Sequence, residues 1–420
     1  MRTTFAVLAV VAACGLVPAA LAAGAKAGTH AGAKAGTSAA TKVASASSAR
    51  VPTGDLRAYM HGIGATTDER GVTTVFFSSS GLPPRGAGRD RNWTHDVYVA
   101  RWTPRQATLD RPRIFISRPE AQEPVSVAQN DTGRVMVSFE DGWNTPNQVS
   151  QRYGVYTSDL KGVKPYPNDV LSGGHSGHVA GVGSRFVVFY SNDWIDGGGV
   201  DNLGTGDGVY VKTFDADGAL LQAIDVAPRV REWWPMIAGS PTRALLVWQQ
   251  YVSGETYARL KVATLDPATG ALSEPHVIAE RLQYYTYAAA WVPSVDRFIV
   301  VATDDKDRGF AELIDANGQT TATLGCMPAS VREAGIAVIG ARAFTPSQDG
   351  RLLHLKLTPS SIELAGTQPS PIKWTYTGSV GLVRSPSALH WVATSPKGLQ
   401  EADFDLNAAS VPGDKDQCRE

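Results

Sequence analysis

A short-strand unit recurs along this chain, and that repeat restricts the possible folds more than any other feature. Four segments share one order: a strongly apolar strand, a second apolar strand, and then an Asp-rich turn. The strongly apolar strands cover residues 135–139, 186–190, 244–248 and 298–301, and the strands that follow cover 154–156, 209–214, 260–265 and 310–314. A further strand follows each turn, as at residues 220–224. Four antiparallel strands in a recurring unit are typical of a propeller blade.

The spacing of the units predicts how many blades there are. First strands are expected near Tyr59, Val125, His178, Trp234, Tyr287, Gly335 and Val380, about 45–65 residues apart, which is the size of one blade. No long amphipathic helix is expected after residue 52, since the pattern is of short Val-, Ile- and aromatic-rich runs between turn residues. We therefore predict an all-β fold, a single β-propeller with seven four-stranded blades. Six or eight blades and a β-sandwich pair are the alternatives.

The beginning of the chain predicts export. Residues 5–13 are apolar, and Ala20, Leu21 and Ala22 form an A-x-A cleavage site, so residues 1–22 are predicted to be a signal peptide. Residues 11–14 also resemble a lipoprotein cleavage box, in which Cys14 would carry a lipid anchor. Residues 23–52 are rich in Ala, Gly, Ser and Lys, which predicts a flexible tether, and the propeller domain is expected over residues 53–420. We expect a secreted, periplasmic or cell-surface monomer with no transmembrane segment in the mature protein.

Charge and cysteine content narrow the class of partner. The formal net charge is −1, without the basic excess of a nucleic-acid-binding protein, so no nucleic acid is expected. After the signal peptide only Cys326 and Cys418 remain. An oxidising compartment favours a disulfide bond between them, and two unpaired thiols are the alternative.

The residues at the start of each predicted first strand are candidates for a binding site, because these loops converge over the central channel of a propeller. They are far richer in His, Arg, Glu and aromatic residues than the strands that they precede, as a cleft for a polar, ring-bearing ligand requires. A plug of the channel mouth is the alternative. The candidates for substrate binding are His61, Glu232, Trp233, Trp234, Tyr284 and Arg332 at these positions, together with Arg91, Trp93 and Trp143 in the loops between second and third strands, which point to the same face.

Two further segments suggest chemistry. His175 and His178 lie in a Gly-Gly-His-Ser-Gly-His run beside a first strand, and imidazole suits proton transfer near neutral pH. Residues 192–207 combine carboxylates and amides with many glycines, which is the composition of a calcium loop but without EF-hand spacing. No cofactor is required, and a structural Ca²⁺ is expected on the oxygens of Asn192, Asp193, Asp196, Asp201 and Asp207. A solvated loop is the alternative.

The Gly-Gly-His175 run into a first strand, followed by the apolar strand at 186–190, resembles the secreted propeller polysaccharide lyases that cut uronate-containing chains. The resemblance implies β-elimination, with a histidine and a tyrosine moving the protons and an arginine neutralising the uronate carboxylate. The catalytic candidates are His175, His178, Arg231 and Tyr285, and Arg91 could also supply the cation. A glycoside hydrolase using Asp141, Asp193 and Glu232 and a non-enzymatic carbohydrate-binding propeller are the alternatives, and an extracellular polysaccharide is the expected partner in each case.

Overall fold

Strands are the regular elements throughout the part of the chain that the structure describes. The computed structural model describes residues 60–79, 95–118, 122–141, 149–192, 208–374, 378–395 and 398–408. The chain divides between Ala46 and Ser47, and all described strands belong to the second unit. The predicted signal peptide and tether lie outside the described residues and stay predictions. Nothing among the described elements is a helix with the length and hydrophobicity needed to cross a bilayer.

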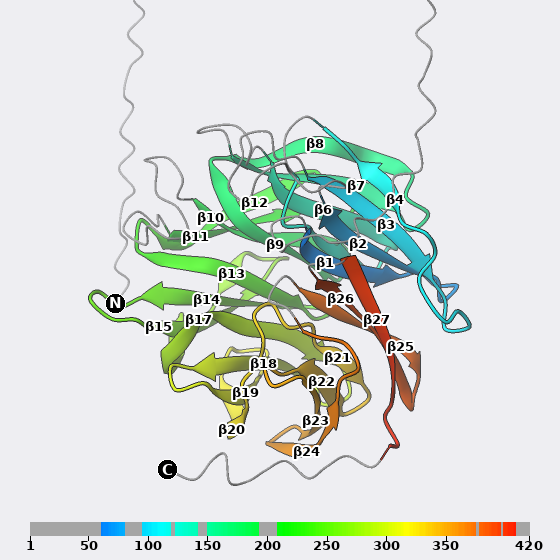
Figure 1. Ribbon diagram of the computed structural model, residues 1–420. Coiled ribbons are helices and arrows are strands. Elements are labelled where there is room, and N and C mark those ends of the chain that lie inside the picture. Colours follow the sequence, from blue (N-terminus) through cyan, green and yellow to red (C-terminus); the bar gives the residue numbers. More distant parts are fainter. Residues whose placement is uncertain are drawn as a thin grey trace, which may run out of the picture. The chain divides into compact units, whose positions relative to one another are not determined.

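The strands group into successive antiparallel units in which neighbours in sequence are neighbours in the sheet (Figure 1). The first three units contain β1 (Met60–Thr67), β2 (Thr73–Ser79), β3 (Asp96–Trp102), β4 (Arg113–Ile116), β5 (Ser126–Gln129), β6 (Arg134–Asp141), β7 (Ser150–Thr157), β8 (Gly162–Ser172), β9 (Gly174–Val182), β10 (Arg185–Asn192), β11 (Gly208–Phe214) and β12 (Leu220–Pro228). The remaining units contain β13 (Glu232–Gly239), β14 (Ala244–Tyr251), β15 (Ala258–Asp266), β16 (Ala271–Leu272), β17 (His276–Val292), β18 (Arg297–Asp304), β19 (Arg308–Ile314), β20 (Thr320–Pro328), β21 (Ala337–Ile339), β22 (Arg342–Pro346), β23 (Arg351–Thr358), β24 (Ser361–Pro369), β25 (Ser379–Ser385), β26 (Ala388–Ser395) and β27 (Gly398–Asp405).

β17 belongs to two units. Its first part pairs with β15 and closes the fourth unit, while its second part pairs with β18 and opens the fifth. At 17 residues it is about twice the length of most other strands. The fourth and fifth units therefore form one continuous sheet of eight strands, including the short β16.

The first strands of the units form a closed series. β1 contacts β5, and contacts continue in order through β9, β13, β17, β21 and β25, which returns to β1. Such a closed series of four-stranded antiparallel units is the arrangement of a β-propeller, and the predicted all-β propeller is confirmed. The described strands make seven units, the last with three strands, so the prediction of four strands in every one of seven blades stays a prediction.

Burial explains the sequence pattern of the repeat. The second strand of a unit packs against neighbouring units on both faces, so β2 is buried throughout, and β6 and β18 are buried along nearly their whole length. A strand covered on both faces is an unbroken apolar run. The fourth strands β8 and β12 alternate between partly buried and exposed residues, because one face meets solvent.

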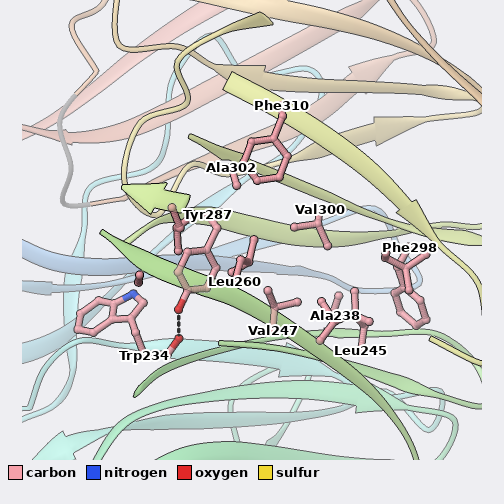
Figure 2. Packing of buried hydrophobic residues seen from close by; sticks show 14 of the residues in the cluster. Trp234, Ala238, Leu245, Val247, Leu260, Tyr287, Phe298, Val300, Ala302 and Phe310 are labelled. Atoms are coloured by element: carbon pink, nitrogen blue, oxygen red, sulfur yellow. Dashed lines mark hydrogen bonds between the residues drawn. The ribbon is translucent and has the colours of Figure 1, made fainter. Parts of the chain in front are cut away.

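The core lies between consecutive units. The cluster joining the fourth and fifth units is shown in Figure 2, where Val247 and Leu260 of one unit face Val300 and Tyr287 of the next. Each fully buried side chain of this size contributes about 1.5–3 kcal/mol relative to remaining exposed. This packing fixes the position of β13 and β17, from which several of the predicted site residues project.

Candidate functional site

In six of the seven units a residue in the left-handed backbone region lies near the start of the first strand or, in the fifth unit, near the start of the part of β17 that pairs with β18. These residues are Gly62, Ser176, Trp234, Tyr285, Glu333 and Gly378, with φ between 51° and 114°. Four of them are not glycine, and this conformation is costly for side-chain-bearing residues, at about 1–3 kcal/mol each. In β9 and β13 the same residue lies in a β-bulge, where the register with the second strand shifts. The bulges change which way the following side chains point, and they occur where the sequence predicts the site.

A cavity of about 210 Å³ lies between the first strands. All seven units contribute to it, through Ile63, Val125, His178, Met236, Ala288, Glu333 and Val380 among others. Most of these residues are apolar, and His178 and Glu333 are the titratable side chains among the described residues that line it. The cavity therefore carries its chemistry on one imidazole and one carboxylate.

His178 is held in its neutral form. Burial lowers the pKa of His178, against the opposing influence of the Glu333 carboxylate and of the backbone carbonyls of Ser176 and Pro235. Its Nδ1 lies 3.1 Å from the carbonyl oxygen of Ser176, which fixes the ring orientation. A neutral imidazole beside a cavity is suited to accept a proton.

Arg332 lies over two aromatic rings next to this cavity. Its guanidinium carbon is 4.5 Å from the ring centroid of Trp234 and 4.5 Å from that of Tyr285. The two rings meet edge to face at 4.8 Å, and Nε of Arg332 donates to the Glu333 carboxylate at 3.3 Å. We call Trp234, Tyr285 and Arg332 the arginine–aromatic cluster. It places a cation against two aromatic rings, beside the Glu333 carboxylate that lines the cavity.

Buried groups hold this cluster in place. Tyr285 donates its backbone N–H to the side-chain oxygen of Gln249 at 3.0 Å. The hydroxyl of Tyr287 donates to the backbone carbonyl of Trp234 (Figure 2). These two bonds join the fourth and fifth units directly beneath the cluster.

The structure separates the two predicted histidines. His175 is 1% exposed, and its ring packs against Trp233 with the centroids 5.1 Å apart. Its Nε2 is 3.4 Å from the Glu140 carboxylate, its Nδ1 contacts the Ser176 hydroxyl, and burial lowers its pKa. Trp233 is likewise buried. The placement makes His175 and Trp233 supports behind the cavity, whereas His178 lines it.

Two of the carboxylates expected for hydrolysis, Asp141 and Glu232, form ion pairs within their own units. Glu232 is buried and accepts hydrogen bonds from the Trp248 indole, from Gln250 at 2.9 Å and from Lys261 at 2.7 Å. Asp141 is also buried, receives a hydrogen bond from Arg152 at 2.8 Å, and accepts another from Tyr166. Both carboxylates are engaged with side chains of their own units, and neither is among the residues that line the cavity between the first strands.

Arg231 and Tyr284 lie near each other, and Tyr284 lies beside Tyr285. The guanidinium carbon of Arg231 is 3.3 Å from the ring centroid of Tyr251. The rings of Tyr284 and Tyr285 are 5.9 Å apart. Burial raises the pKa of Tyr284, with the Tyr251 hydroxyl acting in the same direction and Arg231 opposing it.

Several predicted residues lie outside the described residues, and their roles stay predictions. They are Arg91, Trp93, Trp143, Asp193, Asp196, Asp201 and Asp207. The backbone of His61 lies in β1, opposite Ser78. Asn192 ends β10, and its side-chain oxygen has no hydrogen-bond partner among the described residues. The described residues include no group of three or more His, Cys, Asp or Glu that could hold a metal ion, and the Ca²⁺ site stays a prediction.

Cys326 lies in β20. Its predicted partner Cys418 is outside the described residues, so the disulfide bond between them stays a prediction.

Sequence reasoning missed the partners that hold the site. Glu140 beside His175 and Gln249 beside Tyr285 both come from the ends of second strands. The polar residues that end an otherwise apolar second strand were the available signal, because those ends lie opposite the start of a first strand.

Comparisons with known proteins support the fold. No protein-family model matches the chain, and no curated protein sequence matches it. Among solved structures, the Hadza microbial sialidase Hz136 has a TM-score of 0.50 at 11% identity, covering 84% of this chain and 66% of that one. A chain of the Mitotic Checkpoint Complex has a TM-score of 0.50 at 10% identity, covering 85% of this chain and 93% of that one. A sialidase and a checkpoint protein share little chemistry, so these similarities identify the fold and leave the activity to be argued from the site.

Proposed function

We propose that this protein is an exported propeller that binds a uronate-containing extracellular polysaccharide over the channel mouth and cleaves it by β-elimination. The observation that carries the proposal is the arginine–aromatic cluster next to a neutral histidine. Trp234 is buried and Tyr285 is half-buried, and together they hold the guanidinium of Arg332, which offers a cation for a carboxylate. Export, through the predicted signal peptide or a lipid anchor at Cys14, would bring the protein to such a substrate.

The polar groups of the site form a chain of contacts. The charge of Glu333 acts on the pKa of His178, Glu333 accepts a hydrogen bond from Arg332, and Arg332 lies on Tyr285. The Arg332 side chain is 16% exposed, so a ligand carboxylate can reach part of it. A single ligand could therefore meet a base, a cation and a phenol.

β-Elimination needs these three kinds of group. A base removes the proton on the carbon next to the uronate carboxylate, and the electron pair forms the C4–C5 double bond as the C4–O bond breaks. A cation stabilises the negative charge that develops on the carboxylate, and an acid protonates the departing oxygen. We assign His178 as the base, Arg332 as the cation and Tyr285 as the acid.

The alternatives differ in what they require. Hydrolysis by Asp141, Asp193 and Glu232 is less well supported, because Asp141 and Glu232 are buried in ion pairs within their own units. A non-enzymatic carbohydrate-binding propeller needs the arginine–aromatic cluster but no base. The role of His178 thus separates an enzyme from a binding protein.

The test is to incubate the mature protein with uronate-containing and neutral polysaccharides, and to follow both ultraviolet absorbance from unsaturated uronate ends and new reducing ends. We expect both signals to rise on a uronate-containing chain. His178→Gln should lower the rate by about 10²–10⁴-fold, the usual contribution of a general base. His276→Gln, at the start of β17 and away from the cavity, is the matched control and should leave the rate unchanged.

The other outcomes are equally informative. Reducing ends without absorbance would replace β-elimination by hydrolysis. Retention on one of the polysaccharides with neither signal would indicate a binding protein. Full activity in the His178→Gln variant would remove His178 from the mechanism.

A further inference from the structure

Arg231 lies outside the proposed catalytic group, yet it is arranged as an anion-binding residue. Its guanidinium packs face-on against Tyr251, with the carbon 3.3 Å from the ring centroid. The backbone carbonyl of Arg231 accepts a hydrogen bond from the Tyr251 N–H at 2.9 Å, so both ends of this contact are fixed. Among the described residues the Arg231 side chain has no ion-pair partner, and its buried Nε has no hydrogen-bond acceptor.

A second donor without an acceptor lies near Arg231. The hydroxyl of Tyr284 and Nε of Arg231 are both buried, and neither has a hydrogen-bond partner among the described residues. Arg231 is close enough to act on the pKa of Tyr284. Unpaired buried donors are unfavourable and uncommon in folded proteins. A phenol and a guanidinium without acceptors therefore suggest that the acceptor comes from a ligand.

The position of this pair relates it to the proposed substrate site. Tyr284 follows directly on Gln283 in β17 and precedes Tyr285, whose ring carries Arg332. The rings of Tyr284 and Tyr285 are 5.9 Å apart. Arg231 is thus near Tyr284, and Arg332 lies on the adjacent Tyr285.

We propose that Arg231 and Tyr284 form a second anionic subsite, which binds an oxyanion on another sugar of the chain held by Arg332. This inference rests on the proposed function and specifies its substrate as a glycan with charges on more than one sugar. A carboxylate or a sulfate ester has the acceptor oxygens for both donors. Arg231 acts here in binding, and Arg332 remains the cation of the reacting sugar.

The test measures affinity for galacturonate oligomers, using calorimetry in a His178→Gln background so that no cleavage occurs. The hexasaccharide can reach both arginines, whereas the disaccharide is expected to need only Arg332. We expect Arg231→Gln to weaken hexasaccharide binding by about tenfold or more and to leave disaccharide binding unchanged. Arg332→Gln should weaken binding of both oligomers.

Arg281→Gln is the matched control. Arg281 also lies on a tyrosine, with its guanidinium carbon 3.9 Å from the Tyr257 ring centroid, but Asp305 neutralises its charge. We expect this variant to bind both oligomers like the parent. Tyr284→Phe removes only the unpaired hydroxyl, so it should weaken hexasaccharide binding while leaving the melting temperature equal or higher.

Each outcome decides the proposal. Equal hexasaccharide affinity in the parent and in Arg231→Gln would overturn the second subsite and leave the proposed function standing. Failure of the parent to bind either oligomer would overturn both. A sulfated neutral hexasaccharide that loses affinity in Arg231→Gln would extend the subsite to oxyanions in general, and its failure to bind would restrict the subsite to carboxylates.

Discussion

At the scale of single residues, the site combines strained backbone with side chains whose charge is controlled by burial. Ser176, Trp234, Tyr285 and Glu333 adopt positive φ although none is glycine. Each is followed within a few residues by one that lines the cavity, such as His178 after Ser176 and Met236 after Trp234. The backbone strain is the local cost of directing these side chains toward the channel.

Burial of neutral His178 predicts how stability depends on pH. Its pKa in the folded protein lies below the ordinary 6.5, so the unfolded chain binds more protons as the pH falls below that value. Stability is therefore present above about pH 6.5 and is lost as the pH falls toward the folded-state pKa. We expect His178→Gln to lose less stability than the wild type between about pH 7.5 and pH 5.5, measured by denaturant unfolding.

His276→Gln serves as the control and should keep the wild-type dependence. An unchanged pH slope in His178→Gln would show that another group is responsible.

At the scale of elements, glycine sets how closely neighbouring first strands approach. A Cβ on Gly239 of β13 would lie 2.0 Å from the carbonyl oxygen of Gly181 in β9. A Cβ on Gly181 would lie 2.1 Å from the carbonyl oxygen of Gln129 in β5. Both neighbours are backbone atoms, which cannot move aside without shifting a strand.

We therefore expect Gly239→Ala to lower the free energy of unfolding by about 2 kcal/mol or more, because it forces β9 and β13 apart. Gly325→Ala in β20 is the matched control, since a Cβ there meets no atom within 4 Å. It should change stability by less than about 1 kcal/mol. Equal effects of the two substitutions in denaturant titrations would contradict close packing of the first strands.

The strand repeat was predictable from sequence because burial on both faces leaves an unbroken apolar run, as in β6 and β18. The length of β17 was not, because its polar first part reads as the end of one blade and the beginning of a loop. The site was predictable only as a set. Arg332, Trp234 and Tyr285 were all candidates, but the bulge that turns His178 toward the channel and buries His175 leaves no sequence signal.

At the scale of the whole molecule, the last unit contacts the first through the ring of His390 and the carboxylate of Glu401. Nδ1 of His390 lies 2.8 Å from Asp403 and its Nε2 lies 2.9 Å from Glu401, and its ring stacks on Trp102 of β3 at 5.2 Å. Glu401 also accepts a hydrogen bond from the backbone N–H of Leu109 at 2.7 Å. This seam connects parts of the chain that are almost 300 residues apart in sequence.

His390→Ala should open the seam and destabilise the protein by about 2–4 kcal/mol, since it removes a buried ring and its two hydrogen bonds. Hydrogen exchange should then show lost protection in β3 and β27. His354→Ala is the control, because that histidine contacts Phe344 within a single unit. If His390→Ala left β3 as protected as in the wild type, the contacts around His390 would not hold the ring closed.

β17 restricts how this protein can be rearranged. A turn between two units, such as residues 229–231 before β13, is a place where new chain termini or an inserted domain could be introduced. The single strand β17 joins the fourth and fifth units instead, so a break there would remove hydrogen bonds from two units at once. Circular permutants should therefore be tolerated at turn-bounded junctions and fail within β17, and these two blades would be gained or lost in evolution only as a pair.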